Sequence, residues 1–191
     1  MSRLKPNYHH GDLRNSLLKA AIDLVERNGI AKLSMREVAR QAGVSPGAPY
    51  HHFKNKDALL TALAEVSLWT LDELSTQAKE GCKTPQARLE AIGVAYIRYA
   101  TDHPALFQLM FSYARDDVPS DLSDAPVYRV LASVVREFDL TGEAHIAATM
   151  AAWSLVHGLA VLVIDGPLRH LAHQPEQVMQ LAKAVTAHLR L

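Results

Sequence analysis

The sequence predicts an all-α fold for this chain of 191 residues. Apolar residues recur at the 3.6-residue spacing of amphipathic helices, and helix-capping signals stand where most of these stretches begin. Only 6% of the residues are aromatic, whereas Ala and Leu abound, which favours helices over a β-sandwich. No segment shows the apolar and polar alternation of a half-buried strand. A composition that is 49% apolar and 21% charged is that of an ordinary globular protein.

The first two helices are expected on either side of a short connection. One helix should run from about residue 12 to residue 28, where Gly29 provides the stop. Ser34 and Glu37 have the spacing of a capping box, in which each side chain binds the other residue's backbone amide. This box opens a short second helix that is expected to end at Gly43.

Two more helices follow in the first third of the chain. A short one is expected to begin at Ser45, because Pro46 then falls in the first turn, where its missing N–H costs nothing. Asn55 should cap a long fourth helix that ends near residue 79, before Gly81.

The remainder of the chain also has helical periodicity. One polar stretch, residues 115–124, is expected to be a loop because it is rich in Asp and Ser. The expected helices cover residues 84–102, 104–113, 126–138, 143–164 and 175–189.

The formal net charge of zero conceals two oppositely charged parts. The first 60 residues carry ten Lys and Arg against five Asp and Glu, for a net charge of +5. The other 131 residues carry ten basic and fifteen acidic side chains, for a net charge of −5. Such asymmetry is typical of proteins with a nucleic-acid or membrane partner, although a solvated surface gives the same count.

The basic part contains a helix-turn-helix pattern. Ala39 is small where two helices must touch, Gly43 permits a tight turn, and Val44 is apolar directly after it. The stretches LSMREVARQAGVS, which begins at Leu33, and YHHFKNKDALL, which ends at Leu60, closely resemble the DNA-binding domain of the TetR family of bacterial repressors. With the surrounding helix pattern, the resemblance extends over about residues 1–70.

A second, shorter resemblance lies near the C-terminus. Trp153, His157 and Gly158 match the Trp-x-x-x-His-Gly signature of the C-terminal domain in one TetR subgroup. The two resemblances imply an N-terminal three-helix helix-turn-helix domain with its preceding arm, residues 1–55. They also imply a C-terminal helical domain for effector binding and dimerisation, residues 56–191.

The resemblance and the residue chemistry together give a set of DNA-contacting candidates. Ser34 sits at a helix N-terminus, which favours a phosphate. Small residues let the recognition helix approach the bases closely, while Tyr50 and His51 can hydrogen-bond phosphate oxygens and Lys56 offers a point charge. Arg3 and Lys5, in the N-terminal arm, can add electrostatic attraction. The full candidate set is Ser34, Arg36, Ser45, Gly47, Ala48, Tyr50, His51 and Lys56.

One residue departs from the family pattern. Pro49 stands where this family usually has an apolar residue that is compatible with a helix, and proline crowds the carbonyl group of Ser45. The recognition helix should therefore begin late or with a tight first turn. It also offers no Arg, Asn or Gln for bidentate base contacts, so we expect DNA shape to carry much of the specificity. Phe53 is expected to be a core residue.

The C-terminal part contains a stretch of 19 residues without a charge, residues 146–164. Its length would suit a membrane span, but its Thr, Ser, His and Gly residues and its lack of a basic flank argue against one. A helix that is apolar all round is equally expected between a domain core and a partner subunit. We therefore expect a homodimer through the last two helices, completed by an apolar stripe from Val178 to Leu189, and no membrane partner.

Aromatic residues between the two ends mark an expected effector cavity. By default such residues are core, but the resemblance places a ligand site here, and apolar pockets with a few polar groups are the usual ligand sites. Because no buried cluster of charge is evident, the effector is expected to be small and apolar or aromatic. The candidates are Trp69, Tyr96, Tyr99, His103, Phe107, Phe111, Trp153 and His157.

We therefore expect a cytoplasmic, ligand-responsive repressor that binds double-stranded DNA. The N-terminus lacks the apolar run of a targeting signal. The ten His residues lack the neighbouring ligands of a metal site, the single Cys cannot form a disulfide within the chain, and no catalytic motif is present. We expect no cofactor, no metal and no enzymatic activity. The alternative is a helical ligand-binding or interaction protein without sequence-specific DNA binding.

Overall fold

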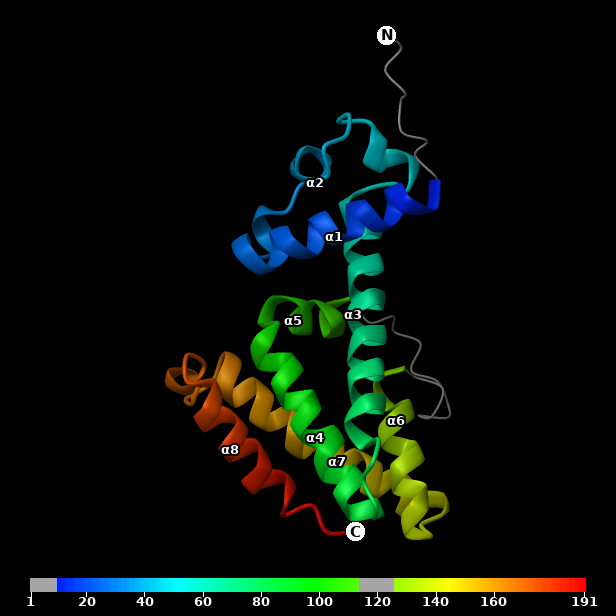
Figure 1. Ribbon diagram of the computed structural model, residues 1–191, viewed down its shortest axis with the longest axis vertical. Coiled ribbons are helices and arrows are strands. Elements are labelled where there is room, and N and C mark those ends of the chain that lie inside the picture. Colours follow the sequence, from blue (N-terminus) through cyan, green and yellow to red (C-terminus); the bar gives the residue numbers. More distant parts are fainter. Residues whose placement is uncertain (1–9, 114–125) are drawn as a thin grey trace.

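The computed structural model describes residues 10–113 and 126–191, and every regular element in these two ranges is a helix (Figure 1). The predicted all-α fold is confirmed. Two predicted features, the N-terminal arm and the loop at residues 115–124, lie outside the described residues. The elements are α1 (His10–Asn28), η1 (Ile30–Lys32), α2 (Met35–Gln41), η2 (Ala48–His51), α3 (Lys56–Lys79), α4 (Pro85–Asp102), α5 (Pro104–Ser112), α6 (Pro126–Val135), η4 (Arg136–Phe138), α7 (Gly142–Ile164), η5 (Arg169–Leu171) and α8 (Pro175–Thr186).

Side-chain caps fix the start of three helices. The side chain of Ser34 accepts a hydrogen bond from the third amide of α2 at 3.2 Å, and Asn55 does the same for α3 at 2.8 Å. Thr84 caps α4 in the same way at 3.1 Å. Each cap satisfies an amide that has no partner within its own helix, and this is why these helix starts could be read from the sequence.

A first apolar core lies at the N-terminal end of the molecule, at the top of Figure 1. It is formed by α1, α2, the first half of α3 and α5, and it is filled almost entirely by aliphatic side chains. Leu106 and Leu109 of α5 are buried in it, although α4 separates α5 from the other three helices along the chain. The first half of α3 therefore belongs to this core, even though the predicted division at residues 55 and 56 precedes it.

A second apolar core occupies the other end of the molecule. It is formed by α4, α6, α7, α8, the second half of α3 and part of α5, and its aromatic members include Tyr96, Tyr99 and Phe107. Gly93 of α4 permits a close approach of α8, because a Cβ atom at Gly93 would lie 2.7 Å from the Thr186 side chain. The helix α3 thus runs through both cores and joins them (Figure 1).

The helices α7 and α8 differ in how far their apolar residues are buried within the chain. The helix α7 is apolar enough and long enough to cross a membrane, and only 33% of its most apolar window is buried. Ile146, Leu155, Val161 and Leu162 lie exposed on its outer face.

The predicted stripe on α8 is oriented differently from our expectation. Val178, Ala182 and Leu189 are buried within their own chain, because α8 packs against α4 and α7. Leu181 and Val185 are only half-buried. The helix itself ends at Thr186, three residues before the predicted end.

Candidate functional site

The helix-turn-helix is built on the first core by α2, a glycine turn and η2. Gly43 adopts a positive φ of 69°, which side chains disfavour, and the chain reverses there. The amide of Val44 donates to the carbonyl of Ala39 at 3.0 Å and closes the end of α2. Phe53, only 3% exposed, anchors the far side of the motif in the core, as predicted.

The third helix of the motif is a single 3₁₀ turn that begins at Ala48, and the expected start at Ser45 is wrong. The carbonyl of Ser45 accepts from the amide of Ala48 at 3.0 Å. In an α-helix starting at Ser45, this carbonyl would need the amide hydrogen of residue 49, which proline lacks. Pro49 instead occupies the first turn of η2, where no donor is needed, and its ring is buried in the apolar interior.

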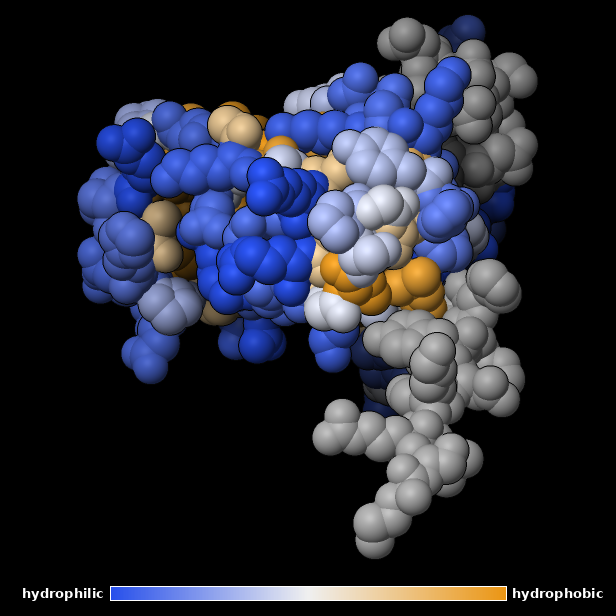
Figure 2. Space-filling view, turned by 90° about the horizontal axis from the view of Figure 1, so that it is seen from above, coloured by the Kyte–Doolittle hydropathy of each residue, from blue (hydrophilic) through white to orange (hydrophobic). Residues whose placement is uncertain are grey.

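The turn formed by η2 presents several of the predicted DNA-contacting residues to solvent. Tyr50 is 57% exposed, and Ser45, Gly47 and His51 are exposed beside it, while Ala48 is half-buried. Seen from this end, the described surface is mostly hydrophilic (Figure 2). An exposed tyrosine hydroxyl with no other role in packing is suited to bind a phosphate oxygen.

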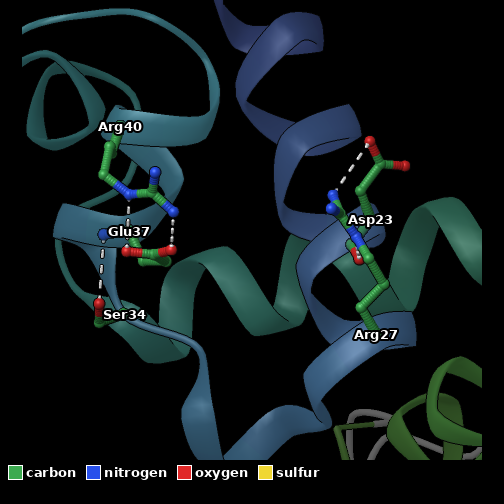
Figure 3. Close-up of polar contacts among 5 residues, drawn as sticks. All are labelled: Asp23, Arg27, Ser34, Glu37 and Arg40. Atoms are coloured by element: carbon green, nitrogen blue, oxygen red, sulfur yellow. Dashed lines mark hydrogen bonds and ion pairs between the residues drawn. The ribbon is translucent and has the colours of Figure 1, made fainter.

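Ser34 and Arg36 lie at the start of α2, on the same part of the molecule. Ser34 is exposed and its hydroxyl already caps the amide of Glu37 (Figure 3). The carboxylate of Glu37 binds the guanidinium of Arg40, which lowers the pKa of that carboxyl (Figure 3). Arg40 is therefore neutralised locally, whereas the Arg36 side chain is exposed.

Lys56 has a structural role that the sequence did not reveal. Its ammonium donates to the carbonyl of Ile30 at 3.2 Å and so ties the start of α3 to η1. An ammonium carries three donors, so two remain for a phosphate. The charge stays half-buried at the base of the helix-turn-helix.

In the second core, five of the eight predicted effector-site residues form one aromatic cluster. The rings of Trp153 and His157 stack at 4.8 Å, and Phe111 lies 4.8 Å from His157 and 6.2 Å from Trp153. Phe107 meets Tyr96 edge-on at 5.5 Å. The aromatic cluster therefore consists of Tyr96, Phe107, Phe111, Trp153 and His157.

A hydrogen bond of 2.8 Å joins the hydroxyl of Tyr96 to Nδ1 of His157 within the cluster. Burial raises the pKa of Tyr96 well above its usual range and lowers the pKa of His157. Both groups are therefore neutral at pH 7, and the hydrogen bond joins two uncharged partners. The indole Nε1 of Trp153 is also buried.

The other three predicted effector-site residues lie elsewhere. Trp69 is 56% exposed, and its ring lies 5.5 Å below the guanidinium of Arg129. Tyr99 is buried beside His103, which binds the carboxylate of Glu26 in α1. These two residues therefore lie at the junction of the two cores and not with the aromatic cluster.

A cavity of about 40 Å³ lies beside Tyr96 and Trp153, between α3, α4, α6 and α7. It has space for a few water molecules, whereas pockets for drug-sized ligands measure about 300–1,000 Å³. An effector can therefore occupy it only if a wall moves. The cavity is lined by Leu71, Asp72, Ser75, Leu89, Ile92, Gly93, Tyr96, Val130, Leu131, Ala152, Trp153, Val156 and Leu189.

One cavity wall carries an ion pair between two helices. Asp72 of α3 is only 7% exposed, and its carboxylate accepts from Nε of Arg129 in α6 at 3.1 Å. A second guanidinium nitrogen binds the other carboxylate oxygen. A bidentate pair of this kind is the strongest geometry that two such groups adopt.

Both the N-terminal and the C-terminal part of the chain match models of known protein families. Residues 17–63 match the family model described as bacterial regulatory proteins of the tetR family. Residues 89–186, more than half of the chain, match the tetracycline-repressor-like C-terminal domain. The chain belongs to the TetR family.

Individual known proteins resemble the chain to different extents. A transcriptional regulator named BetI from Rhizobium meliloti is 34% identical over 79 residues, which are 41% of this chain and 39% of that protein. The match thus spans about two fifths of the relative's length. A solved Rhodococcus structure of unknown function is 30% identical, covers 96% of this chain and 97% of its own, and has a TM-score of 0.76. A TetR protein from Acinetobacter baumannii in complex with minocycline covers 91% of this chain and 94% of its own, with 18% identity and a TM-score of 0.63.

Sequence reasoning missed four polar or aromatic residues of this TetR protein's second core. Asp72 and Ser75 line the cavity, Arg129 pairs with Asp72, and the ring of Tyr128 lies 5.1 Å from Trp153. A signal for Asp72 was present, because it lies beside Leu71 and four residues after Leu68, on the apolar side of α3.

Proposed function

We propose that the protein is a ligand-responsive transcriptional regulator that acts in the cytoplasm. A homodimer binds a palindromic operator, and a small effector releases it. One observation carries the proposal: α3 connects an exposed helix-turn-helix on a closed core to a second core that contains a cavity. The stacked rings of Trp153 and His157, with Gly158 next in sequence, support membership of the Trp-x-x-x-His-Gly subgroup.

The helix-turn-helix end has the chemistry for phosphate binding. The first 60 residues carry a net charge of +5, and Arg36, Tyr50 and His51 are exposed. The turn η2 holds only four residues, two of which are Ala48 and Pro49. Backbone contacts and DNA shape therefore contribute more to specificity than bidentate base contacts do.

The outer face of α7 supports dimerisation. Leu155, Val161 and Leu162 are exposed on a helix whose opposite face is buried in the second core. A second copy of the chain would cover this face with its own α7 and α8. Such pairing places two helix-turn-helix motifs about one DNA turn apart, which suits a palindromic site.

Two elements can pass a change in the cavity on to the helix-turn-helix. The helix α3 has residues in both cores, and α5 buries Leu106 and Leu109 in the first core while Phe107 belongs to the aromatic cluster. An effector lowers DNA affinity to the extent that it prefers the conformation with unsuitable motif spacing. The minocycline bound to the relative from Acinetobacter baumannii supports a small organic molecule as the effector class.

The test of DNA binding uses fluorescence anisotropy with labelled DNA from the region flanking the coding sequence. We expect affinity to fall steeply between about 50 and 200 mM salt, because phosphate contacts release counterions. Lys56→Ala should weaken binding about equally across sequences and reduce the logarithmic salt slope by about one. Tyr50→Phe should lower affinity several-fold, by the loss of one phosphate hydrogen bond.

The control is Lys83→Ala, which removes the same charge from an exposed position before α4 and should leave the slope unchanged. Circular dichroism of Lys56→Ala checks that loss of the bond to Ile30 has not unfolded the motif. Binding that is insensitive to salt would instead favour a ligand-binding protein without DNA affinity. An unchanged slope in Lys56→Ala would remove Lys56 from the phosphate contacts.

A further inference from the structure

We propose that the effector is an organic cation, an apolar molecule with one protonated amine that binds Asp72 in place of Arg129. This inference rests on the proposed function, because it concerns the same cavity. It sharpens the expectation of a small apolar or aromatic effector by adding one positive charge.

Asp72 gives the cavity its charge. Among the described residues that line the cavity, it is the only one with a carboxylate or a basic group. The nearby hydroxyl of Ser75 is also largely buried, and the rest of the lining is mainly aliphatic. A carboxylate in such surroundings requires a cation, since a buried charge without a partner is strongly unfavourable.

Arg129 is a partner that can leave. Its side chain is 52% exposed, whereas the side chain of Asp72 is 6% exposed. The guanidinium rests on the exposed ring of Trp69 and can remain hydrated when it moves outward. Asp72 has no comparable route to water, because it is buried in the cavity wall of the second core.

Opening the cavity would also separate this ion pair. The cavity is too small for a drug-sized molecule, so a wall must move. The wall from α6 consists of Val130 and Leu131, which follow Arg129 directly. A ligand that displaces α6 therefore draws Arg129 away from Asp72. A cationic ligand replaces the lost charge, but a neutral or anionic ligand leaves the carboxylate unpaired.

The aromatic residues that line the cavity specify the other features of the ligand. Tyr96 and Trp153 present aromatic surface to the cavity, which favours a flat apolar body and attracts a cation. Because Asp72 belongs to α3, the exchange of Arg129 for a ligand acts on the helix that also packs in the first core.

The test uses three probes with one skeleton and different charges: 4-phenylbutylamine, 4-phenylbutan-1-ol and 4-phenylbutanoate. Titration calorimetry with the full-length protein should show that the amine binds at least about tenfold more tightly than the alcohol. The acid should bind more weakly than both. In Asp72→Asn, which keeps the shape of the side chain, the amine and the alcohol should bind about equally.

Arg129→Gln provides a second and opposite change. It removes the internal competitor of the ligand, so the amine should bind severalfold more tightly than it does to the wild type. Because Asp72 is then unpaired without ligand, the amine should also raise Tm more in this variant. The matched control, Arg88→Gln, removes the ion pair between α4 and Glu137 of η4 and should leave the order of the three probes unchanged.

Three results would overturn the inference: failure of the amine to bind, an alcohol or acid that binds the wild type as tightly as the amine does, or full amine binding by Asp72→Asn. Anisotropy with operator DNA is measured in parallel and reports on the proposed function separately. A protein that binds DNA but does not prefer the amine would contradict only the proposal of a cationic effector. A protein that prefers the amine but never binds DNA would contradict only the proposed function as a DNA-binding regulator.

Discussion

The two cores of this protein are similar in helical architecture but differ in what fills them. The first core is closed by aliphatic side chains such as Leu17 and Leu63, and Phe53 is the one aromatic ring among its buried members that the structure describes. The second core contains the aromatic cluster, a cavity and a largely buried carboxylate, Asp72. The first is packed as a rigid support, whereas the second retains space and polar groups that a ligand can use.

This difference shows how one chain can combine a fixed surface with an adjustable interior. A recognition turn of only four residues has few hydrogen bonds of its own, so its position depends on the closed core beneath it. A cavity lowers stability through lost van der Waals contacts, and a ligand that fills it restores them. The first core therefore holds the recognition turn in a fixed position for DNA binding, and the second core allows the protein to respond to a ligand.

Truncation of one leucine in each core should produce the largest effects and test this contrast directly. Leu17→Ala should lower the free energy of unfolding by about 3–4 kcal/mol, because its fully buried side chain leaves a new cavity. Leu89→Ala should cost about 1 kcal/mol less, because Leu89 already borders empty space. Urea unfolding followed by circular dichroism measures both values. Equal costs would show that the two cores are packed alike.

Removal of one helix cap in each part should have a smaller effect and separate stability from function. Ser34→Ala and Thr84→Ala each remove a side-chain acceptor from the third amide of a helix and should cost about 1 kcal/mol. Only Ser34→Ala should also lower DNA affinity, since only α2 is expected to meet a phosphate. Thermal unfolding and DNA anisotropy on the same preparations test this, and an equal loss of DNA affinity in both variants would contradict it.

The smallest expected effect is a pH dependence of the free energy of unfolding that arises in the second core. Burial lowers the pKa of His157 below its ordinary value of 6.5, so below this pH the unfolded chain takes up a proton before the folded protein does. The contribution of His157 to stability is therefore complete above pH 6.5 and decreases as the pH falls further. The slope cannot exceed about 1.4 kcal/mol per pH unit for one proton.

Thermal unfolding between about pH 5 and 8 measures this dependence. His157→Gln should reduce it, because the titrating ring is gone. Tyr96→Phe should retain it, because the hydrogen bond is lost but the burial that lowers the pKa remains. A flat profile in Tyr96→Phe would assign the effect to the hydrogen bond instead of burial.

Local signals predicted the helices well and the recognition turn less well. Ser34 and Asn55 cap their helices as the sequence indicated, because a cap depends only on residues within one turn. Pro49 was recognised as a disturbance of the third helix. Its outcome, a 3₁₀ turn that begins at Ala48, depends on burial of the proline ring in the core, which local rules do not include.

The effector site was harder to predict because it depends on contacts between distant helices. Tyr96 and Trp153 could be anticipated as neighbours from the family resemblance. Trp69 could not be distinguished from them by residue type, although it lies exposed beside Arg129. The pairing of Asp72 with Arg129, 57 residues apart, requires a three-dimensional arrangement that helical periodicity does not supply.

The continuity of α3 limits how this protein can exchange parts with its relatives. A recombinant that replaces everything after residue 55 would bring a foreign α3 and remove Leu59, Leu60 and Leu63 from the first core. A junction after α3 would instead separate Asp72 from Arg129. Chimeric sensors made from this chain should therefore retain the first half of α3 and take the second half of α3 from the new effector domain. The fusion point of such a chimera should therefore lie within α3, between Ala64 and Leu71.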